Sequence, residues 1–133
     1  MSPKEIQSNL PNGFHGAIIE RVTIDYFSRT AEFAMNLLVK NDATHSVSRK
    51  GRFQVSGLAF CTLGVPSPHY DYMSPSGIEI GSLLDTTPKI LPSLQAFRNE
   101  LGSAVFFHSF FVEEWNEFIH FAGTDATFEW LEP

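Results

Sequence analysis

The fold is decided by a stretch of alternating side chains at residues 15–39, which reads HGAIIERVTIDYFSRTAEFAMNLLV. The apolar face of its first half comprises Ile18, Val22, Ile24 and Tyr26, with Glu20 as the exception. The apolar face of its second half comprises Phe33, Met35, Leu37 and Val39. Alternation with a period of two is typical of half-buried strands, and residues 27–30 predict a tight turn between them. The stretch therefore predicts a β-hairpin.

The rest of the chain predicts further strands. Residues 52–65 alternate in the same way, and Gly57 in their middle predicts a bulge or a close backbone approach. Residues 78–84 predict a short edge strand. Residues 104–112 form a near-continuous apolar run, which predicts a strand that is covered on both faces. With strands at 117–122 and 126–131, this run predicts a three-stranded meander.

Polar and Pro-rich segments separate these strands. Residues 40–50 and 66–77 predict loops, and residues 1–13 predict an N-terminal tail that ends in a turn. Leu94, Phe97 and Leu101 are spaced for a helix over residues 93–101, with Gly102 at its end. We expect a single domain at residues 14–133. It is mainly β, an antiparallel two-layer β-sandwich or flattened open barrel with at most one short helix.

The composition limits the classes of partner. The net charge is −6, and because phosphate contacts need Lys and Arg, we expect no nucleic-acid partner. Arg49, Lys50 and Arg52 lie close together, but we interpret them as a solvated loop end rather than a phosphate site. The chain has 13 Phe and only 18% charged residues, which favours a surface covered by a protein partner or by a second copy in a homodimer.

The chain has the features expected of a cytoplasmic protein. Cys61 is the single cysteine, so no intrachain disulfide forms, which fits a reducing compartment. Because its neighbours are apolar, we expect a buried, inert thiol. The N-terminus lacks a signal-peptide pattern, and no run of about 18 apolar residues predicts a membrane-spanning segment.

Three histidines, His15, His108 and His120, form a candidate pocket at the mouth of the sandwich, since imidazoles bind zinc and carry out acid–base chemistry. The turn at residues 113–116 decides whether two of them meet. If Val112 pairs with Glu117, His108 and His120 point to opposite faces of the sheet, whereas a three-residue turn would place them on one face. No His-x-His, His-Glu-x-x-His or Cys-x-x-Cys spacing is present, so we expect no metal site.

Aromatic residues outside the strands are candidate contact residues. His69, Tyr70 and Tyr72 lie on a loop stiffened by prolines, where amphipathic rings are typical of recognition surfaces. Trp115 follows two glutamates at a predicted turn, where it either anchors a basic partner or caps the open end of the sandwich. The remaining carboxylates are dispersed, and no nucleophile elbow or phosphate-binding loop is present. We therefore expect no catalytic residue and no cofactor.

Two ends of the chain resemble a known group of proteins. The start is Leu10-Pro11-Asn12-Gly13-Phe14-His15-Gly16-Ala17, followed by Ile24-Asp25-Tyr26 and Arg29-Thr30. The end comprises residues 109–112, Trp115-Asn116 and residues 118–120. Both are similar to uncharacterised small bacterial β-rich proteins that begin with a Gly-Phe-His-Asp-Ala-type segment. Here Gly16 stands where that group has Asp. More loosely, the chain resembles the immunity proteins of bacterial polymorphic toxin systems, which implies a toxin-binding role.

Two functional hypotheses follow. The first is a non-enzymatic binding or interaction module, similar to an immunity protein, with His69, Tyr70, Tyr72 and Trp115 as contact residues. The alternative is a small enzyme or ligand-binding protein with a histidine-containing pocket at the mouth of the sandwich.

Overall fold

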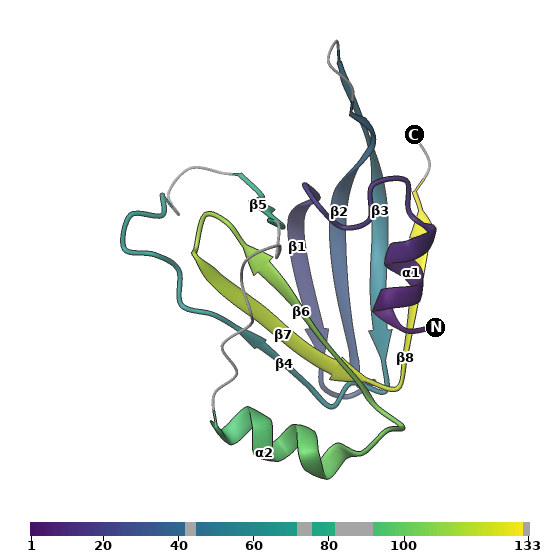
Figure 1. The fold of residues 1–133 in the computed structure, drawn as a ribbon, viewed down its shortest axis with the longest axis vertical. Helices are drawn as coiled ribbons and strands as arrows, with labels where there is room; N and C mark the ends of the chain where they lie inside the picture. The colour runs from purple at the N-terminus through teal and green to yellow at the C-terminus, as the bar shows by residue number, and fades with distance from the viewer. Residues whose placement is uncertain (42–44, 72–75, 82–91, 132–133) are drawn as a thin grey trace.

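The computed structural model of the chain describes residues 1–41, 45–71, 76–81 and 92–131. It is mainly β, and its two antiparallel sheets confirm the predicted fold class (Figure 1). The helices are α1 (Pro3–Asn9) and α2 (Pro92–Leu101). The strands are β1 (Ile18–Asp25), β2 (Thr30–Asn41), β3 (Ser46–Ser56), β4 (Phe60–Leu63), β5 (Ile78–Glu79), β6 (Phe106–Val112), β7 (Glu117–Gly123) and β8 (Asp125–Trp130). Within the described ranges, neither helix has the length and apolarity needed to cross a bilayer.

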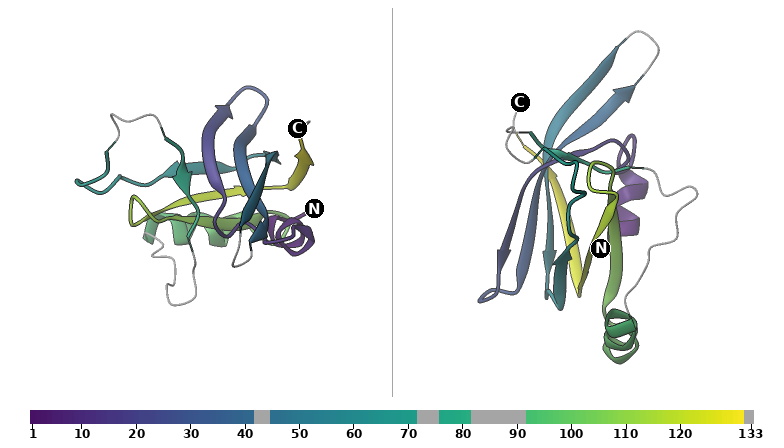
Figure 2. Two further views of the ribbon diagram at one scale, coloured as in Figure 1. Left: turned by 90° about the horizontal axis from the view of Figure 1, so that it is seen from above. Right: turned by 90° about the vertical axis from the view of Figure 1, so that its left-hand side faces the viewer.

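The two sheets are joined at both sides. The larger sheet has the order β5-β1-β2-β3-β8 and the smaller has the order β4-β7-β6, and Figure 2 shows the smaller sheet lying across one side of the larger. Ile80, directly after β5, bridges to Val112 of β6. On the other side, the chain passes from β7 to β8 through Thr124, whose N–H donates to the Ser56 carbonyl (3.1 Å). The core lies between the two sheets.

The strand predicted at residues 52–65 is two strands in different sheets. β3 ends at Ser56 and β4 begins at Phe60, and Gly57 between them has a φ of +57°. An L-residue rarely adopts this backbone conformation, so glycine permits the change of sheet. Of the two predicted roles of Gly57, the close approach is confirmed, because the glycine lies against Thr124, whereas in place of a bulge it forms a corner.

Two other expectations about the strands were also wrong. Residues 40–50 were expected to be a loop, but β2 and β3 pair as far as Asn41 and Ser46, and this ribbon extends beyond the neighbouring strands (Figure 1). The meander is also incomplete, because β8 pairs with β3 rather than with β7. Thus the C-terminal strand completes the larger sheet.

The first strand contains a bulge that the alternation hid. Ile19 pairs with Met35 and Val22 pairs with Phe33, so the register shifts at Glu20. Ile19, not Ile18, therefore shares the core face with Val22. A bulge adds one residue to a strand and reverses the alternation beyond it, which explains why Glu20 interrupted the pattern.

The N-terminal tail contains a second helix. Ser2 caps α1, since its Oγ accepts the Glu5 N–H at 3.2 Å, and Pro3 occupies the first turn. Ile6 is 4% exposed and belongs to the core. The expectation of at most one short helix was therefore wrong, whereas α2 confirms the helix predicted at residues 93–101.

The core is built around five phenylalanine rings. They are Phe14, Phe33, Phe53, Phe110 and Phe121. The Phe110 ring centroid lies 5.1 to 5.9 Å from those of the other four, mostly in edge-to-face or tilted arrangements. Such pairs stabilise a core beyond the effect of their buried area. The high Phe content thus reflects the interior as well as the surface.

Candidate functional site

The register of the smaller sheet separates two of the candidate histidines. Val112 pairs with Glu117, and Ser109 pairs with His120, which confirms the register considered from the four-residue turn. His108 faces the core between the sheets, whereas His120 lies on the outer face of β7. The two imidazoles therefore do not share a ligand.

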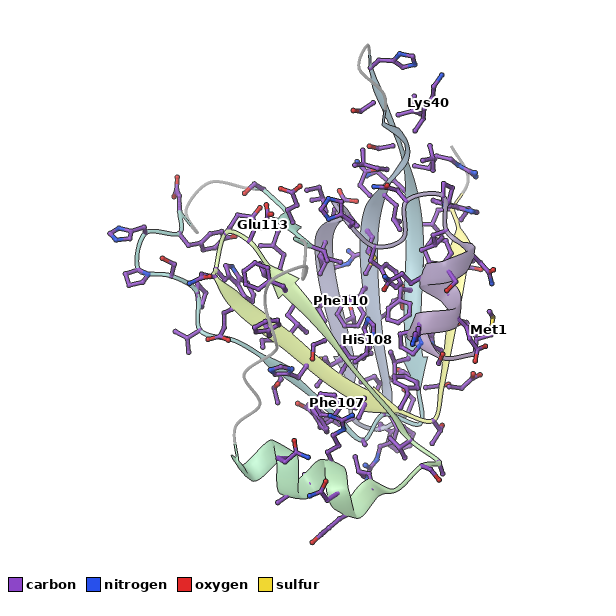
Figure 3. The ribbon with its side chains drawn as sticks, in the orientation of Figure 1. Met1, Lys40, Phe107, His108, Phe110 and Glu113 are labelled. Atoms are coloured by element: carbon purple, nitrogen blue, oxygen red, sulfur yellow. The ribbon has the colours of Figure 1, made fainter. Side chains whose placement is uncertain are left out.

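The half-buried His108 imidazole lies against the rings of the aromatic core (Figure 3). Its ring centroid lies 5.4 Å from that of Phe110 and 5.6 Å from that of Phe121. Burial disfavours the charged form and lowers the pKa of His108 to about 4. A group that stays neutral and packed in this way is suited to structure rather than to proton transfer near neutral pH.

His120 forms a close pair with Ser109 on the outer face. The Ser109 Oγ lies 2.6 Å from His120 Nδ1, and the imidazole stacks on the Phe118 ring at 15°. The pKa of His120 is lowered by burial, an effect that the charge of Glu117 opposes. A serine beside a neutral imidazole is also the pairing of nucleophilic catalysis. Here, however, His120 is only 5% exposed and its ring also packs against that of Phe107, so the pair is placed for packing.

His15 lies apart from both of these histidines. It is exposed and lies near Glu79, where a positive charge on His15 would oppose the upward shift that burial and the neighbouring glutamates give the pKa of Glu79. The structure therefore brings none of the three candidate histidines together. Among the described residues, no group of three or more His, Cys, Asp and Glu side chains could hold a metal ion.

Tyr70 and Trp115, two of the candidate contact residues, do meet. Their ring centroids lie 6.2 Å apart in an edge-to-face arrangement, and both rings are partly buried against the core. His69 is exposed on the same loop, and Tyr72 lies outside the described residues. The Trp115 Nε1 atom is buried with no hydrogen-bond partner within the described part of the chain. The pair thus covers one end of the sandwich, and both side chains remain partly exposed to solvent.

Three glutamates meet close to Trp115, where β5 passes the turn between β6 and β7, and Figure 3 labels Glu113 at that turn. The Glu79 N–H donates to both carboxylate oxygens of Glu114, at 2.8 and 3.0 Å. The Glu113 N–H donates to the Glu79 carbonyl at 3.1 Å. We call the surface formed by Glu79, Glu113, Glu114, Tyr70 and Trp115 the acidic end.

The carboxylates of the acidic end repel one another. Burial raises the pKa of Glu79, and the charges of Glu113 and Glu114 and a side-chain hydrogen bond with Glu113 raise it further. Like charges held together favour the protonated form of one member. Sequence reasoning noted the glutamates beside Trp115 but left Glu79 among the dispersed carboxylates, because its approach depends on the bridge between Ile80, directly after β5, and Val112 of β6.

The other candidate groups are engaged within the chain. Cys61 is partly rather than fully buried, but burial still raises the pKa of its thiol to about 11, in line with the expected inert cysteine. The Arg49 guanidinium lies 4.6 Å from the centre of the Trp130 ring, and Lys50 pairs with Glu20 at 3.4 Å. Arg52 pairs with Glu129 and Glu32. This basic trio lies on β3 rather than on a loop, with Lys50 and Arg52 paired to carboxylates and Arg49 placed over an aromatic ring.

Comparison with known proteins adds no assignment: no family model, curated protein or solved structure matches the chain.

Proposed function

We propose that the chain is a non-enzymatic binding module that recognises a basic protein partner through the acidic end. The observation that carries this proposal is the trio of Glu79, Glu113 and Glu114, which backbone hydrogen bonds hold together against their mutual repulsion. A cationic side chain placed beside them would relieve that repulsion and lower the pKa of Glu79.

The surroundings of the trio favour a protein as the source of that cation. Trp115 follows Glu114 directly in the chain and its ring meets that of Tyr70, and such aromatic residues often dominate the binding energy at protein interfaces. Arg also binds well over aromatic faces. The net charge of −6 would attract a basic partner over a longer range and speed its association.

The resemblance to immunity proteins fits this class of partner. A toxin that acts on nucleic acid needs Lys and Arg to contact phosphates, so it presents the kind of surface that the acidic end would bind. The alternative, a histidine-containing pocket, has the Ser109–His120 pair as its best support. The enclosed position of that pair makes the binding module our preferred function.

The test is a titration of the 15N-labelled protein with a peptide of five arginines alternating with glycine. We expect the largest shifts at residues 79 and 113–115, including the indole N–H of Trp115. The Glu113→Gln/Glu114→Gln variant should weaken the dissociation constant at least fivefold.

The matched control is Glu5→Gln/Glu100→Gln, which removes the same charge from exposed positions on α1 and α2. It should leave the dissociation constant within twofold of that of the wild type. Equal weakening in both variants, or shifts scattered over the surface, would mean that only the net charge matters and would overturn the proposal.

A further inference from the structure

The outer face of the larger sheet carries a depression of about 340 Å³ across strands β1, β2 and β3. This face points away from the smaller sheet and from both helices (Figure 2), so the depression is separate from the acidic end. In the register of the sheet, Ala34 of β2 lies between Arg21 of β1 and Arg52 of β3. The small side chain of Ala34 leaves space between the two longer ones.

The bulge in β1 gives this depression charges of both signs. In a regular strand, consecutive side chains point to opposite faces of the sheet. Here the register shifts between Ile19 and Arg21, and Glu20 and Arg21 both line the depression. Bulges are frequent next to functional sites, where they redirect a side chain. A carboxylate and a guanidinium from consecutive residues are thereby held beside one site.

The ionic groups around the depression can exchange partners with a ligand. Lys50 Nζ lies 3.4 Å from Glu20 Oε2, and the two side chains are 63% and 41% exposed. Exposed pairs of this kind contribute little to stability. Within the described part of the chain, Arg21 has no carboxylate partner. A ligand carboxylate can therefore bind Arg21 and Lys50, provided that a ligand cation replaces Lys50 beside Glu20.

The charges favour a ligand that carries both signs. A carboxylate alone would draw Lys50 away and leave Glu20 unpaired, and an ammonium alone would leave Arg21 without a partner. Arg52, the neighbouring cation on this face, is already paired with Glu32 and Glu129 and adds no unpaired charge. An ammonium and a carboxylate on the same carbon atom satisfy all the groups. These requirements are met by the head group of a free α-amino acid.

The apolar part of the lining indicates the side chain of the ligand. Ala34 and Leu131 are half-buried, and Met35 and Gly51 are buried residues that line the same depression. A cavity of about 150 Å³ holds a benzene molecule. A volume of about 340 Å³ thus accommodates a ring of that size together with the amino-acid head group.

We propose that this depression binds a free α-amino acid with an apolar side chain of about the size of phenylalanine. The ligand carboxylate pairs with Arg21 and Lys50, its ammonium pairs with Glu20, and its side chain lies over Ala34 against Leu131. Because paired strands already hold these residues in place, binding costs little conformational entropy. This binding site is independent of the proposed recognition of a basic protein by the acidic end.

The test is a titration of the 15N-labelled protein with L-phenylalanine. We expect saturable shifts at residues 20–21, 34, 50–51 and 131, with a dissociation constant in the millimolar range or below. N-acetyl-L-phenylalanine lacks the ammonium and L-phenylalaninamide lacks the carboxylate. Each of these two compounds should bind at least tenfold more weakly than L-phenylalanine.

Variants of the lining locate the site. Arg21→Gln and Glu20→Gln should each weaken the dissociation constant of L-phenylalanine at least fivefold, and Ala34→Leu should abolish binding because it fills the depression. The matched controls are Arg98→Gln and Glu5→Gln, which remove the same charges from exposed positions on the helices. They should leave the dissociation constant within twofold of that of the wild type. Thermal unfolding checks that each variant is folded.

Three results would overturn the proposal. One is the absence of saturable shifts, or shifts that lie outside the lining of the depression. Another is equal affinity for L-phenylalanine and N-acetyl-L-phenylalanine, because the site would then recognise a carboxylate alone. The third is an unchanged dissociation constant in a folded Arg21→Gln or Ala34→Leu variant. If Ala34→Leu does not fold, the two glutamine variants and the comparison of the three compounds decide the outcome.

Discussion

Replacing the half-buried imidazole of His108 with a phenyl ring should remove a large part of the protein's sensitivity to mild acid. The folded protein holds His108 neutral between Phe110 and Phe121, which lowers its pKa to about 4. In the unfolded chain the same group titrates near the ordinary value of 6.5. Between these two values the unfolded state binds the extra proton, so the free energy of unfolding falls as the pH falls.

The magnitude follows from the two pKa values. The full difference corresponds to about 3 kcal/mol, since one pH unit is worth about 1.36 kcal/mol. At pH 5 about 2 kcal/mol of this is already lost relative to pH 8. A domain of this size has a total stability of about 5–15 kcal/mol, so the loss is easily measured.

The assay is urea unfolding of the wild type and His108→Phe at pH 8 and pH 5, followed by circular dichroism. We expect the variant to lose about 2 kcal/mol less than the wild type between these two values. Part of the dependence should remain, because the pKa of His120 is also lowered by burial. His69→Gln, at an exposed position, should behave like the wild type. An equal loss in the wild type and His108→Phe would refute the assignment of the acid sensitivity to this imidazole.

Three further substitutions test the packing of the two sheets. Phe110→Ala should lower the free energy of unfolding by about 3–5 kcal/mol in urea, because it empties the centre of the aromatic core. Gly57→Ala should cost more than about 1 kcal/mol by the same assay, since φ is +57° and the new Cβ would lie 1.9 Å from Thr124 Oγ1. Ser109→Ala should leave His120 Nδ1 without its partner and cost about 1–3 kcal/mol, with a changed 15N shift of the imidazole.

Local patterns predicted most of the secondary structure. Alternation in β1 and β2, the apolar run of β6 and the four-residue turn before β7 each depend on neighbouring residues only. For this reason the hairpins and the opposite faces of His108 and His120 were accessible from the sequence. Ser2 and Pro3 at the start of α1 are a recognised helix-start signal. A seven-residue helix is stable only with a core contact such as that of Ile6, however, and the sequence alone does not show this contact.

The candidate surfaces were less accessible for a different reason. Tyr70 and Trp115 were candidate contact residues, yet each also packs against the core, and the meeting of Glu79 with Glu114 completes the acidic end only in the folded chain. The depression on the larger sheet was missed because regular alternation places Glu20 and Arg21 on opposite faces. Glu20, a charged residue on the predicted apolar face, was the signal that could have found the bulge.

The sequence by itself determined that this chain forms extended segments with one apolar face, because side-chain direction in a strand repeats every two residues. The tertiary structure alone decided which segments became neighbours. Gly57 turns the chain from one sheet into the other, β8 joins β3, and Ile80 bridges to Val112. Those pairings depend on how distant apolar faces fit together around one core, and they bring Glu79 to Glu113 and Leu131 to Lys50.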